Sequence, residues 1–333
     1  MPELHNLLTD VDGLKVGHAQ NNNALTGCTV VLIEKGAVGG VDQRGGAPGT
    51  RETDLLRPMH LVDKVHGIVL SGGSAFGLDA ASGVVKYLEE KGIGFNSGPA
   101  RVPIVPAAVL FDLGIGDPSV RPDAAMGYQA CLNATSGIFA TGNVGAGTGA
   151  TVGKIFGMGQ AMKSGIGSAS LDIGGGVIVS ALVAVNAFGD IVDPSNQQII
   201  AGARPIQAGP FHIGGKAQFA NTLDVMKSKT GRTIMTFASA ASNTVIGIIA
   251  TNARLNKEDA NKVAQMSHNG LAKTIRPAHT MFDGDTIFAI ATGKHKADVN
   301  IVGSFAVEVM ANAVINAVLS ARPAGNLPAF NPE

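Results

Sequence analysis

Short apolar runs, separated by glycine-rich turns and amphipathic segments, dominate the pattern of this 333-residue chain. Runs of β-branched and small apolar residues predict buried strands at 28–34, 66–70, 177–185, 245–250 and 286–291. Apolar residues at helical spacing predict helices over 71–91, 256–273 and 301–319. Residues 7–16 contain a turn group and are expected to form a hairpin with 28–34. This order predicts an α/β fold, and we expect one domain spanning residues 1–333.

Two glycine clusters look like nucleotide-binding or nucleophile loops. Residues 145–150 satisfy GxGxxA, but the glycines that follow make a poor crossover helix. A phosphate cradle at 72–77 remains open, although close helix–strand packing accounts better for its glycines. After the strand at 66–70, a nucleophile elbow needs GxSxG, and Phe76 occupies the last position, so Ser74 fails that test. In the second cluster, a Walker loop needs Gly where Thr148 stands and Ser or Thr where Ile155 stands. We therefore interpret the second cluster as a loop that brings its final residue, Lys154, into a confined place; the alternative is a solvated loop lysine.

Composition narrows the function classes. Hydrophobic residues make up 45% of the chain and charged residues 15%, with 25 Lys and Arg against 25 Asp and Glu. This balance gives no support for a nucleic-acid or membrane-surface partner and favours a small ligand. Cys28 and Cys131 stand far apart without a CxxC partner, and the histidines lack metal-ligand spacing, so we expect no metal and no cofactor. The first 12 residues lack a signal-peptide pattern, and a cytoplasmic location is expected.

Polar residues at strand ends are the candidate chemical groups. Thr244 follows Asn243 at the head of the strand 245–250, where a hydroxyl is commonly a cap or turn former. The alternative is a nucleophile whose own α-amine acts as its base once the Asn243–Thr244 bond is cut. Asn186 follows the strand 177–185. An amide at this position is commonly a turn former, and it can also donate a hydrogen bond to a developing oxyanion. The weakly patterned segment 193–242 before Thr244 is expected to be an accessible connection.

Asp283 and Asp285 precede the strand 286–291. If the chain is already extended there, period two places both carboxylates on one face, about 7 Å apart, with Gly284 on the other. Two carboxylates beside an apolar strand are costly to bury unless they bind cations or amines. A solvated Asp-Gly-Asp turn is an equally good local interpretation.

These segments together resemble the DmpA-like family of self-processing peptidases. The resemblance rests on SGGSAFGLDAA (71–81), GK (153–154), Asn186, NTVI (243–246) and HTMFDGDT (279–286), in family order over nearly the whole chain. The Asn-Thr junction and the DGDT segment are most similar to the nylon-oligomer hydrolase and pantetheine hydrolase branch. The resemblance implies a four-layer αββα sandwich, similar to N-terminal nucleophile hydrolases but differently connected. It also implies a homo-oligomer of four or more copies.

The resemblance further implies autocatalytic cleavage between Asn243 and Thr244, which would leave chains of residues 1–243 and 244–333. It assigns Thr244 as the nucleophile of an aminopeptidase or amidase that acts on small peptides, amides or esters. By the same matching, the conserved polar pair is Lys154 and Asn186, and the acidic pair is Asp283 and Asp285. Some relatives place a Tyr hydroxyl near the oxyanion where this chain has Phe111. Asn186 and backbone N–H groups would then stabilise the oxyanion.

Three alternatives remain open at the level of the sequence. An acyltransferase of the ornithine acetyltransferase type also cleaves itself before a Thr, and release of free acid or transfer to an added amine separates the two. A nucleotide-binding α/β protein would use 72–77 or 145–150, and a nucleotide titration tests it. A purely structural protein would remain an intact chain after purification.

Overall fold

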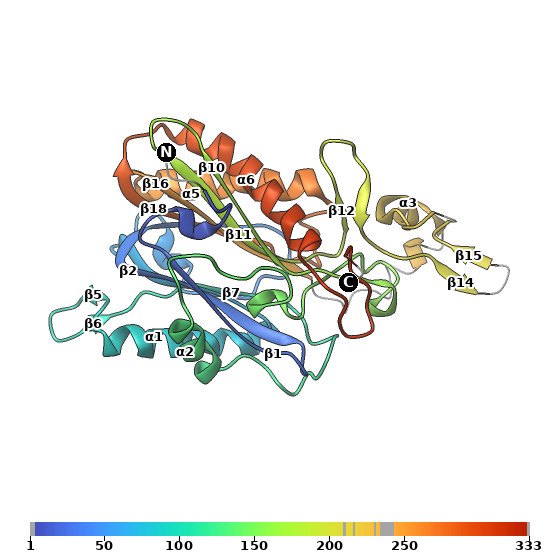
Figure 1. The fold of residues 1–333 in the computed structure, drawn as a ribbon, viewed down its shortest axis with the longest axis horizontal. Coiled ribbons are helices and arrows are strands. Elements are labelled where there is room, and N and C mark those ends of the chain that lie inside the picture. Colours follow the sequence, from blue (N-terminus) through green and yellow to red (C-terminus); the bar gives the residue numbers. More distant parts are fainter. Residues whose placement is uncertain (1–3, 209–210, 216, 230, 234–242, 332–333) are drawn as a thin grey trace.

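The long strand β2 (Thr26–Gln43) connects two sets of strands in the main sheet (Figure 1). Its first half pairs antiparallel with β1 (Lys15–Asn21) and β4 (Lys64–Ser71), and its second half pairs with β18 (Thr286–His295). The register against β4 shifts between Leu32 and Ala37, and such an irregularity bends a strand. β2 therefore belongs to both halves of the sheet.

The structure, a computed structural model, describes residues 4–208, 211–215, 217–229, 231–233 and 243–331. The strand order is β10-β11-β16-β18-β2-β4-β7-β3, and β1 pairs with β2 beside this path. The strands not yet located are β10 (Ile166–Asp172), β11 (Ile178–Asn186), β16 (Thr244–Ala253), β7 (Ala107–Val109) and β3 (Thr50–Arg51). β16 lies antiparallel to β11 and parallel to β18, so it is a central strand.

Two pairs of helices cover the outer faces of the sheet (Figure 1). α5 (Lys257–Thr274) and α6 (Val299–Leu319) pack on the side of β10, β11 and β18, while α1 (Ala80–Glu90) and α2 (Ala124–Leu132) pack on β1, β2 and β4. Three buried clusters fill the spaces: one below each helix pair and one between the two halves of the sheet. The expected αββα sandwich is confirmed.

Alternate side chains of β16 enter different clusters, as the period of a strand requires. Val245 and Ile249 face α5 and α6, whereas Ile246 and Ile248 face the space between the sheet halves. Thr244 shares the parity of Ile246, so its side chain belongs to the inner space. The hydroxyl therefore stands at the edge of the layer between the two halves.

Most predicted elements are present with shifted ends. The helix expected at 256–273 is α5, and Asn256 caps it by accepting a hydrogen bond from Asp259 N–H. The helix expected at 71–91 begins as a 3₁₀ segment, η3 (Ser74–Asp79), before α1. The hairpin is confirmed, but the start of its first strand was wrong: residues 8–10 form η1 (Leu8–Asp10), and β1 starts only at Lys15. The Asp10 carboxylate accepts from the N–H of Leu7, which stabilises a turn there.

The strand β2 also continues further than expected, through Gly39 and Gly40 to Gln43. A Cβ on Gly40 would lie 2.4 Å from the carbonyl carbon of Ala260 on α5. Glycine is needed because the helix backbone packs directly on the strand, which the composition of this stretch does not reveal.

Short elements complete the fold. They are η2 (Asp54–Leu56), β5 (Phe95–Asn96), β6 (Arg101–Val102), η4 (Gly145–Gly147), β8 (Thr151–Val152), η5 (Met158–Gln160), β9 (Met162–Lys163), β12 (Asp190–Val192), β13 (Ile199–Ala201), β14 (Ile206–Ala208), β15 (Phe211–Ile213), α3 (Thr222–Lys227) and β17 (Ile275–Arg276). β14, β15 and α3 lie at one end of the molecule (Figure 1). They belong to the connection expected at 193–242, of which 209–210, 216, 230 and 234–242 lie outside the described residues.

The apolar helix α6 is long enough to cross a membrane by length and composition, and among the described residues it alone passes that test. In the fold, 61% of its apolar window is buried, and it packs against β10, β11 and α5. Such packing is what the core helix of a layered α/β protein requires.

Candidate active site

The parallel pairing of β16 with β18 continues past the ends of both strands to bring Thr244 beside Gly284. Ile246 pairs with Thr286, and the same register places Asn243 opposite Asp283. Asn243 N–H donates to Phe282 O at 2.8 Å, and Gly284 N–H donates to Asn243 O at 2.9 Å. The Thr244 hydroxyl also hydrogen-bonds to Asn243 O. The carbonyl before Thr244 is thus held between a hydroxyl and a backbone N–H.

Gly284 has no room for a side chain. A Cβ there would lie 2.3 Å from Ala47 O and 2.9 Å from Thr244 Oγ1. The loop that follows β2 causes the first contact, since Ala47 N–H donates to Asp283 O at 3.0 Å and Arg44 N–H donates to Asp285 O at 2.8 Å. Only glycine lets this loop and the Thr244 hydroxyl approach the same backbone.

Asn186 and Lys154 meet beside Thr244. Asn186 is the pairing partner of Thr244 across β11 and β16. Lys154 Nζ donates to Asn186 Oδ1 at 2.7 Å and to Asn186 O at 3.2 Å. The Asn186 amide nitrogen donates to Phe111 O at 2.8 Å. Phe111 therefore takes part through its backbone carbonyl, which sets the direction of the amide.

Lys154 is only 5% exposed, so the solvated-loop interpretation of this residue is excluded. Burial lowers the pKa of the Lys154 ammonium to about 7, although the carboxylates of Asp283 and Asp112 act in the opposite direction. An amine with such a pKa exists in both charged and neutral forms near pH 7. It can therefore exchange a proton under ordinary conditions.

Asp283 and Asp285 are both 2% exposed, which excludes a solvated turn. Asp283 Oδ2 accepts from the N–H and the hydroxyl of Thr280, at 2.8 and 2.6 Å. Burial, reinforced by the charge of Asp285, raises the pKa of the Asp283 carboxyl. Asp285 Oδ1 accepts from Val245 N–H at 2.8 Å. Asp285 thus contacts the start of β16 through the strand backbone, whereas Asp283 is held by Thr280.

The two carboxylates share the parity of Ile287, which faces α5, and Gly284 shares that of Phe288, which faces the inner space. One face for both carboxylates, opposite Gly284, stays a prediction from period two. The structure adds that Thr244 lies on the Gly284 side. Asp285 Oδ1 contacts the backbone N–H of Val245, the residue after Thr244.

Sequence reasoning missed His279 and Gly284 as site residues. His279 Nδ1 lies 2.7 Å from Asp285 Oδ2, and its backbone N–H also donates to this oxygen, at 3.2 Å. Their position in the sequence could have pointed to them, because both residues lie within the HTMFDGDT segment that carries the two aspartates.

A second buried cluster lies next to the site. Thr26 hydroxyl and Gly73 N–H each donate to the Asp112 carboxylate at 2.7 Å, and burial raises its pKa. This contact shows what the first glycine cluster does: a Cβ on Gly72 would lie 2.1 Å from Asp112 Oδ2. The turn at 71–77 therefore packs against a carboxylate, which explains its glycines without a nucleotide.

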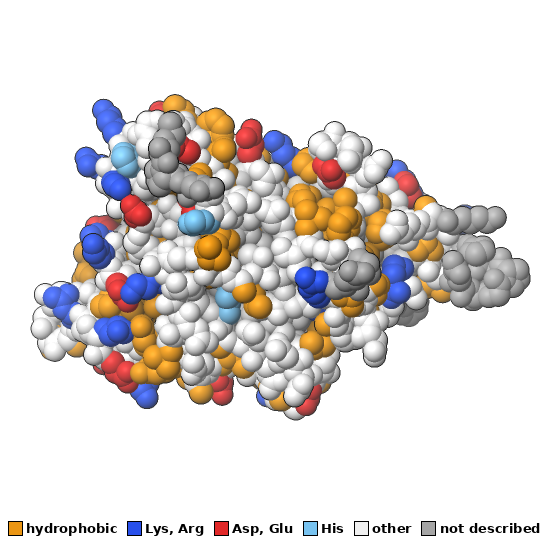
Figure 2. All heavy atoms as spheres, in the orientation of Figure 1, with side chains coloured by type: hydrophobic (Ala, Val, Ile, Leu, Met, Phe, Trp, Pro, Cys, Tyr) orange, Lys and Arg blue, Asp and Glu red, His pale blue; other side chains and the backbone are white. Residues whose placement is uncertain are grey.

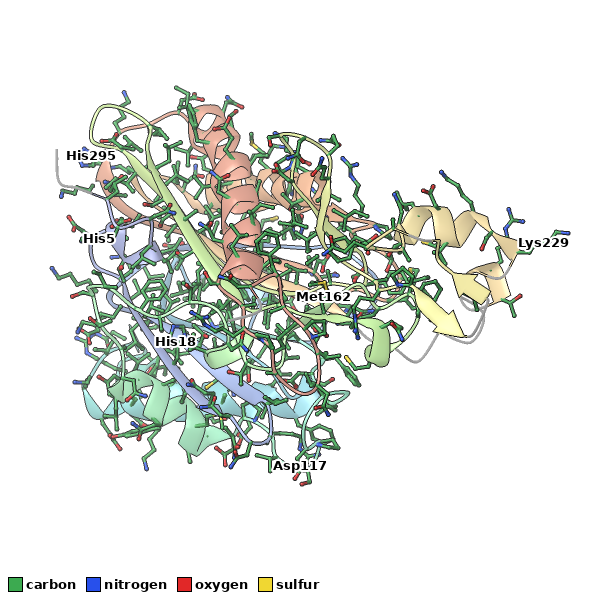
Figure 3. All side chains as sticks on the ribbon, turned by 45° about the vertical axis from the view of Figure 1, so that its right-hand side comes forward. His5, His18, Asp117, Met162, Lys229 and His295 are labelled. Atoms are coloured by element: carbon green, nitrogen blue, oxygen red, sulfur yellow. The ribbon has the colours of Figure 1, made fainter. Side chains whose placement is uncertain are left out.

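A cavity of about 660 Å³ lies elsewhere, at the other end of β16, and is lined by Asn252, Asp12, Lys294 and His295 among others. Thr244 and Asn252 are separated by roughly 26 Å along an extended strand. His5 and His295 lie near one end of the molecule, away from Lys229 at the other (Figure 3). On the face in Figure 2, charged side chains of both signs are scattered rather than gathered in one patch.

Comparisons with known proteins identify the family of this chain. Residues 6–327 match the model described as peptidase family S58. An uncharacterized aminopeptidase of Mycobacterium tuberculosis is 41% identical over 355 residues, covering 98% of this chain and 97% of that protein. A 6-aminohexanoate-oligomer endohydrolase of a Kocuria species is 32% identical over 324 residues, covering 92% and 84%.

Two solved structures share the fold at low sequence identity. A Burkholderia β-aminopeptidase has a TM-score of 0.69 at 21% identity and covers 99% of this chain and 92% of its own. An L-aminopeptidase D-Ala-esterase/amidase from Ochrobactrum anthropi, described as a variant of the Ntn hydrolase fold, has a TM-score of 0.70 at 18% identity and covers 98% and 89%. The chain belongs to peptidase family S58 and is a hydrolase of peptide or amide bonds.

Proposed function

We propose that this protein cleaves its own chain between Asn243 and Thr244 and then uses Thr244 as an N-terminal nucleophile to hydrolyse peptide or linear amide bonds. The observation that carries the proposal is the position of the Asn243 carbonyl. Its oxygen accepts from Gly284 N–H at 2.9 Å, and the Thr244 hydroxyl lies against the same oxygen. A hydroxyl and a fixed donor at one carbonyl are the two parts that an acyl-transfer step needs.

Self-cleavage begins when Thr244 Oγ attacks the Asn243 carbonyl carbon and loses its proton. The oxygen becomes an oxyanion, which Gly284 N–H stabilises. Collapse breaks the C–N bond, the nitrogen takes a proton, and an ester remains between Asn243 and Thr244 Oγ. Water then hydrolyses this ester to give a carboxylate on Asn243 and a free α-amine on Thr244.

Before cleavage the Thr244 nitrogen is an amide and cannot act as the base. Lys154 has a pKa near 7 and binds both oxygens of Asn186, the residue that pairs with Thr244. Its neutral form is suited to take the hydroxyl proton in the first step. The α-amine released by cleavage has a reference pKa of about 7.7–8.0 and takes over as base in later turnovers.

In turnover, Thr244 Oγ attacks the substrate carbonyl, the leaving amine receives the proton, and water releases the acid from the acyl-enzyme. Asn186 has two amide N–H groups, and Phe111 O accepts one of them. The second N–H and Gly284 N–H are the donors proposed for the oxyanion. Removal of one such donor costs about 3–4 kcal/mol in well-studied enzymes.

The substrate class follows from relatives and stays part of the proposal. The relatives at 41% identity are named aminopeptidases, and one at 32% identity acts on 6-aminohexanoate oligomers. We therefore expect small aminoacyl amides, short peptides or linear amide oligomers as substrates, with esters as a second class. A cytoplasmic homo-oligomer of four or more copies, without a nucleic-acid or membrane partner, completes the proposal.

Mass spectrometry of the purified protein tests self-cleavage. The expected result is a 243-residue chain and a 90-residue chain that begins with Thr244, from a precursor of 333 residues. Thr244→Ala should give one intact chain without hydrolase activity. Thr244→Ser keeps a hydroxyl and should still be cut, which makes it the matched control. Cleavage at this bond in the Thr244→Ala variant contradicts the proposal.

A further inference from the structure

His279 holds the carboxylate of Asp285 from two directions. Its ring Nδ1 lies 2.7 Å from Asp285 Oδ2, and its backbone N–H donates to the same oxygen at 3.2 Å. The other oxygen, Oδ1, accepts from Val245 N–H at 2.8 Å. One side chain therefore connects the backbone of the residue after Thr244 to the imidazole of His279.

The backbone of His279 adopts a left-handed conformation with φ of 58°. A side chain other than glycine rarely adopts this conformation, and Asn, Asp and His tolerate it better than most. The conformation directs both the N–H and the ring of His279 toward Asp285. The local strain is thus associated with a contact to the site.

A second histidine packs against the ring of His279. His268 on α5 meets it edge to face, with 4.9 Å between ring centroids. His268 is fully buried, and its Nε2 lies 3.0 Å from Asp42 O. Burial lowers the pKa of His268 to about 3, so its ring stays neutral and places no positive charge next to His279. The neighbouring Arg44 guanidinium is paired with the Asp42 carboxylate at 2.8 Å.

We propose that His279 is a positioning residue: it fixes Asp285, and through Asp285 it fixes Val245 N–H and the adjoining nucleophile. The inference rests on the proposed function of Thr244. Without the imidazole, the Asp285 carboxylate can rotate away from Val245 N–H. The start of β16 then loses an anchor immediately after Thr244, while the residues proposed to bind the substrate oxyanion stay in place.

The decisive comparison is His279→Gly against His279→Asn. Both residues adopt a positive φ more readily than most, so neither variant adds backbone strain at this position. Asn places an amide N–H at the position of Nδ1, and Gly places nothing there. We expect His279→Gly to lower both the self-cleavage rate and kcat by about 10²-fold, with KM unchanged. A loss of this size is typical when a reacting group is displaced by about 1 Å. His279→Asn should recover most of that loss.

Further variants separate positioning from a general effect on stability. His279→Gln carries the same amide one bond further from the backbone and should resemble Gly in rate. If the Gly variant does not fold, the Asn and Gln variants make the same comparison. Unfolding midpoints of the variants, measured in the uncut Thr244→Ala background, should not follow the order of the rates.

Two results would overturn the inference: a Gly variant as fast as the wild type, or an Asn variant as slow as Gly. A wild-type chain that stays intact, or a Thr244→Ala variant that is cut, refutes the proposed function instead, because neither depends on residue 279. The two failures are therefore distinguishable by the same mass measurements.

Discussion

Lys154 and Lys163 lie in the same part of the fold, and burial lowers the pKa of each to about 7. Lys163 is fully buried, and its ammonium donates to three backbone carbonyls: Gly147 at 3.2 Å, and Ala150 and Ser164 at 2.8 Å. Lys154 instead donates to the side chain and backbone of Asn186, the residue paired with Thr244. The same pKa thus accompanies two different environments.

The difference shows that a perturbed pKa does not identify a functional lysine by itself. Lys163 uses its N–H groups to hold two carbonyls of the glycine loop 145–150 and that of Ser164, just before β10, which is a structural task. Lys154 donates to Asn186, the residue paired with Thr244, and is the lysine proposed to act in self-cleavage. The partners of each ammonium group, rather than its burial, separate the two roles.

Replacement of Lys154 by Met gives the largest expected effect and tests the comparison directly. Met keeps the length of the side chain and removes the amine, so we expect self-cleavage to slow by about 10²- to 10⁴-fold, the range for loss of a general base. The fraction of cut chain against time, followed by mass spectrometry, measures it. Lys163→Met is the matched control and should still be cut; equal losses in both would remove the distinction.

Gly284→Ala should follow, with a loss of self-cleavage of about 10²-fold, because the added methyl collides with Ala47 O and crowds Thr244 Oγ1. Gly159→Ala is the control, since a Cβ there meets no atom within 4 Å. Comparing the self-cleavage rates of Gly284→Ala and Lys154→Met shows which contributes more to the first step, the close contact at Gly284 or the amine of Lys154. Normal cleavage in the Gly284→Ala chain would mean that the close approach is not needed.

Lys163→Met should act on stability rather than on chemistry. In the uncut Thr244→Ala background we expect its free energy of unfolding at pH 9 to fall by about 1–3 kcal/mol, since buried carbonyls lose their donor. Urea denaturation of both proteins provides the measurement.

The pH dependence of stability gives a further test. The pKa of each lysine is about 7 in the folded chain and about 10.4 when unfolded, so between these values the unfolded state binds more protons. The free energy of unfolding should therefore rise as the pH is raised from 7 to 10. The rise should be smaller in Lys163→Met, and an unchanged slope would place the Lys163 pKa near its ordinary value.

The smallest effect is expected for Lys294→Ala at the far end of β16. Lys294 and Asp12 form an exposed ion pair at 2.9 Å, with 58% and 78% of their side chains exposed. Exposed pairs contribute roughly 0–1 kcal/mol. We expect a change in stability within this range and unchanged cleavage. A marked loss of activity would connect the cavity near Asn252 to the site and weaken the contrast between buried and surface lysines.

Much of the fold was predictable because its strands are strongly apolar and its helices are capped. The strand that ends at Asn186, the strand that starts after Thr244 and the helix after Asn256 follow from local pattern alone. The extension of β2 through Gly39 and Gly40 did not, because those glycines are selected by the approach of α5. The first strand of the hairpin was misplaced because Asp10 binds a nearby backbone N–H, a contact that periodicity does not encode.

The sequence by itself determined which chemical groups are present and where they lie on their elements: Thr244 and Asn186 at strand ends, Lys154 at the end of a glycine loop, and Asp283 and Asp285 with the same parity. Only the tertiary structure decided which groups face one another. The register of β16 and β18 puts Gly284, rather than the carboxylates, beside the Thr244 hydroxyl, and it places Asp285 against Val245 N–H. The alternation of side chains between the two faces of a strand follows from the local backbone. The pairing of strands and the choice of buried face depend on residues far apart in the chain.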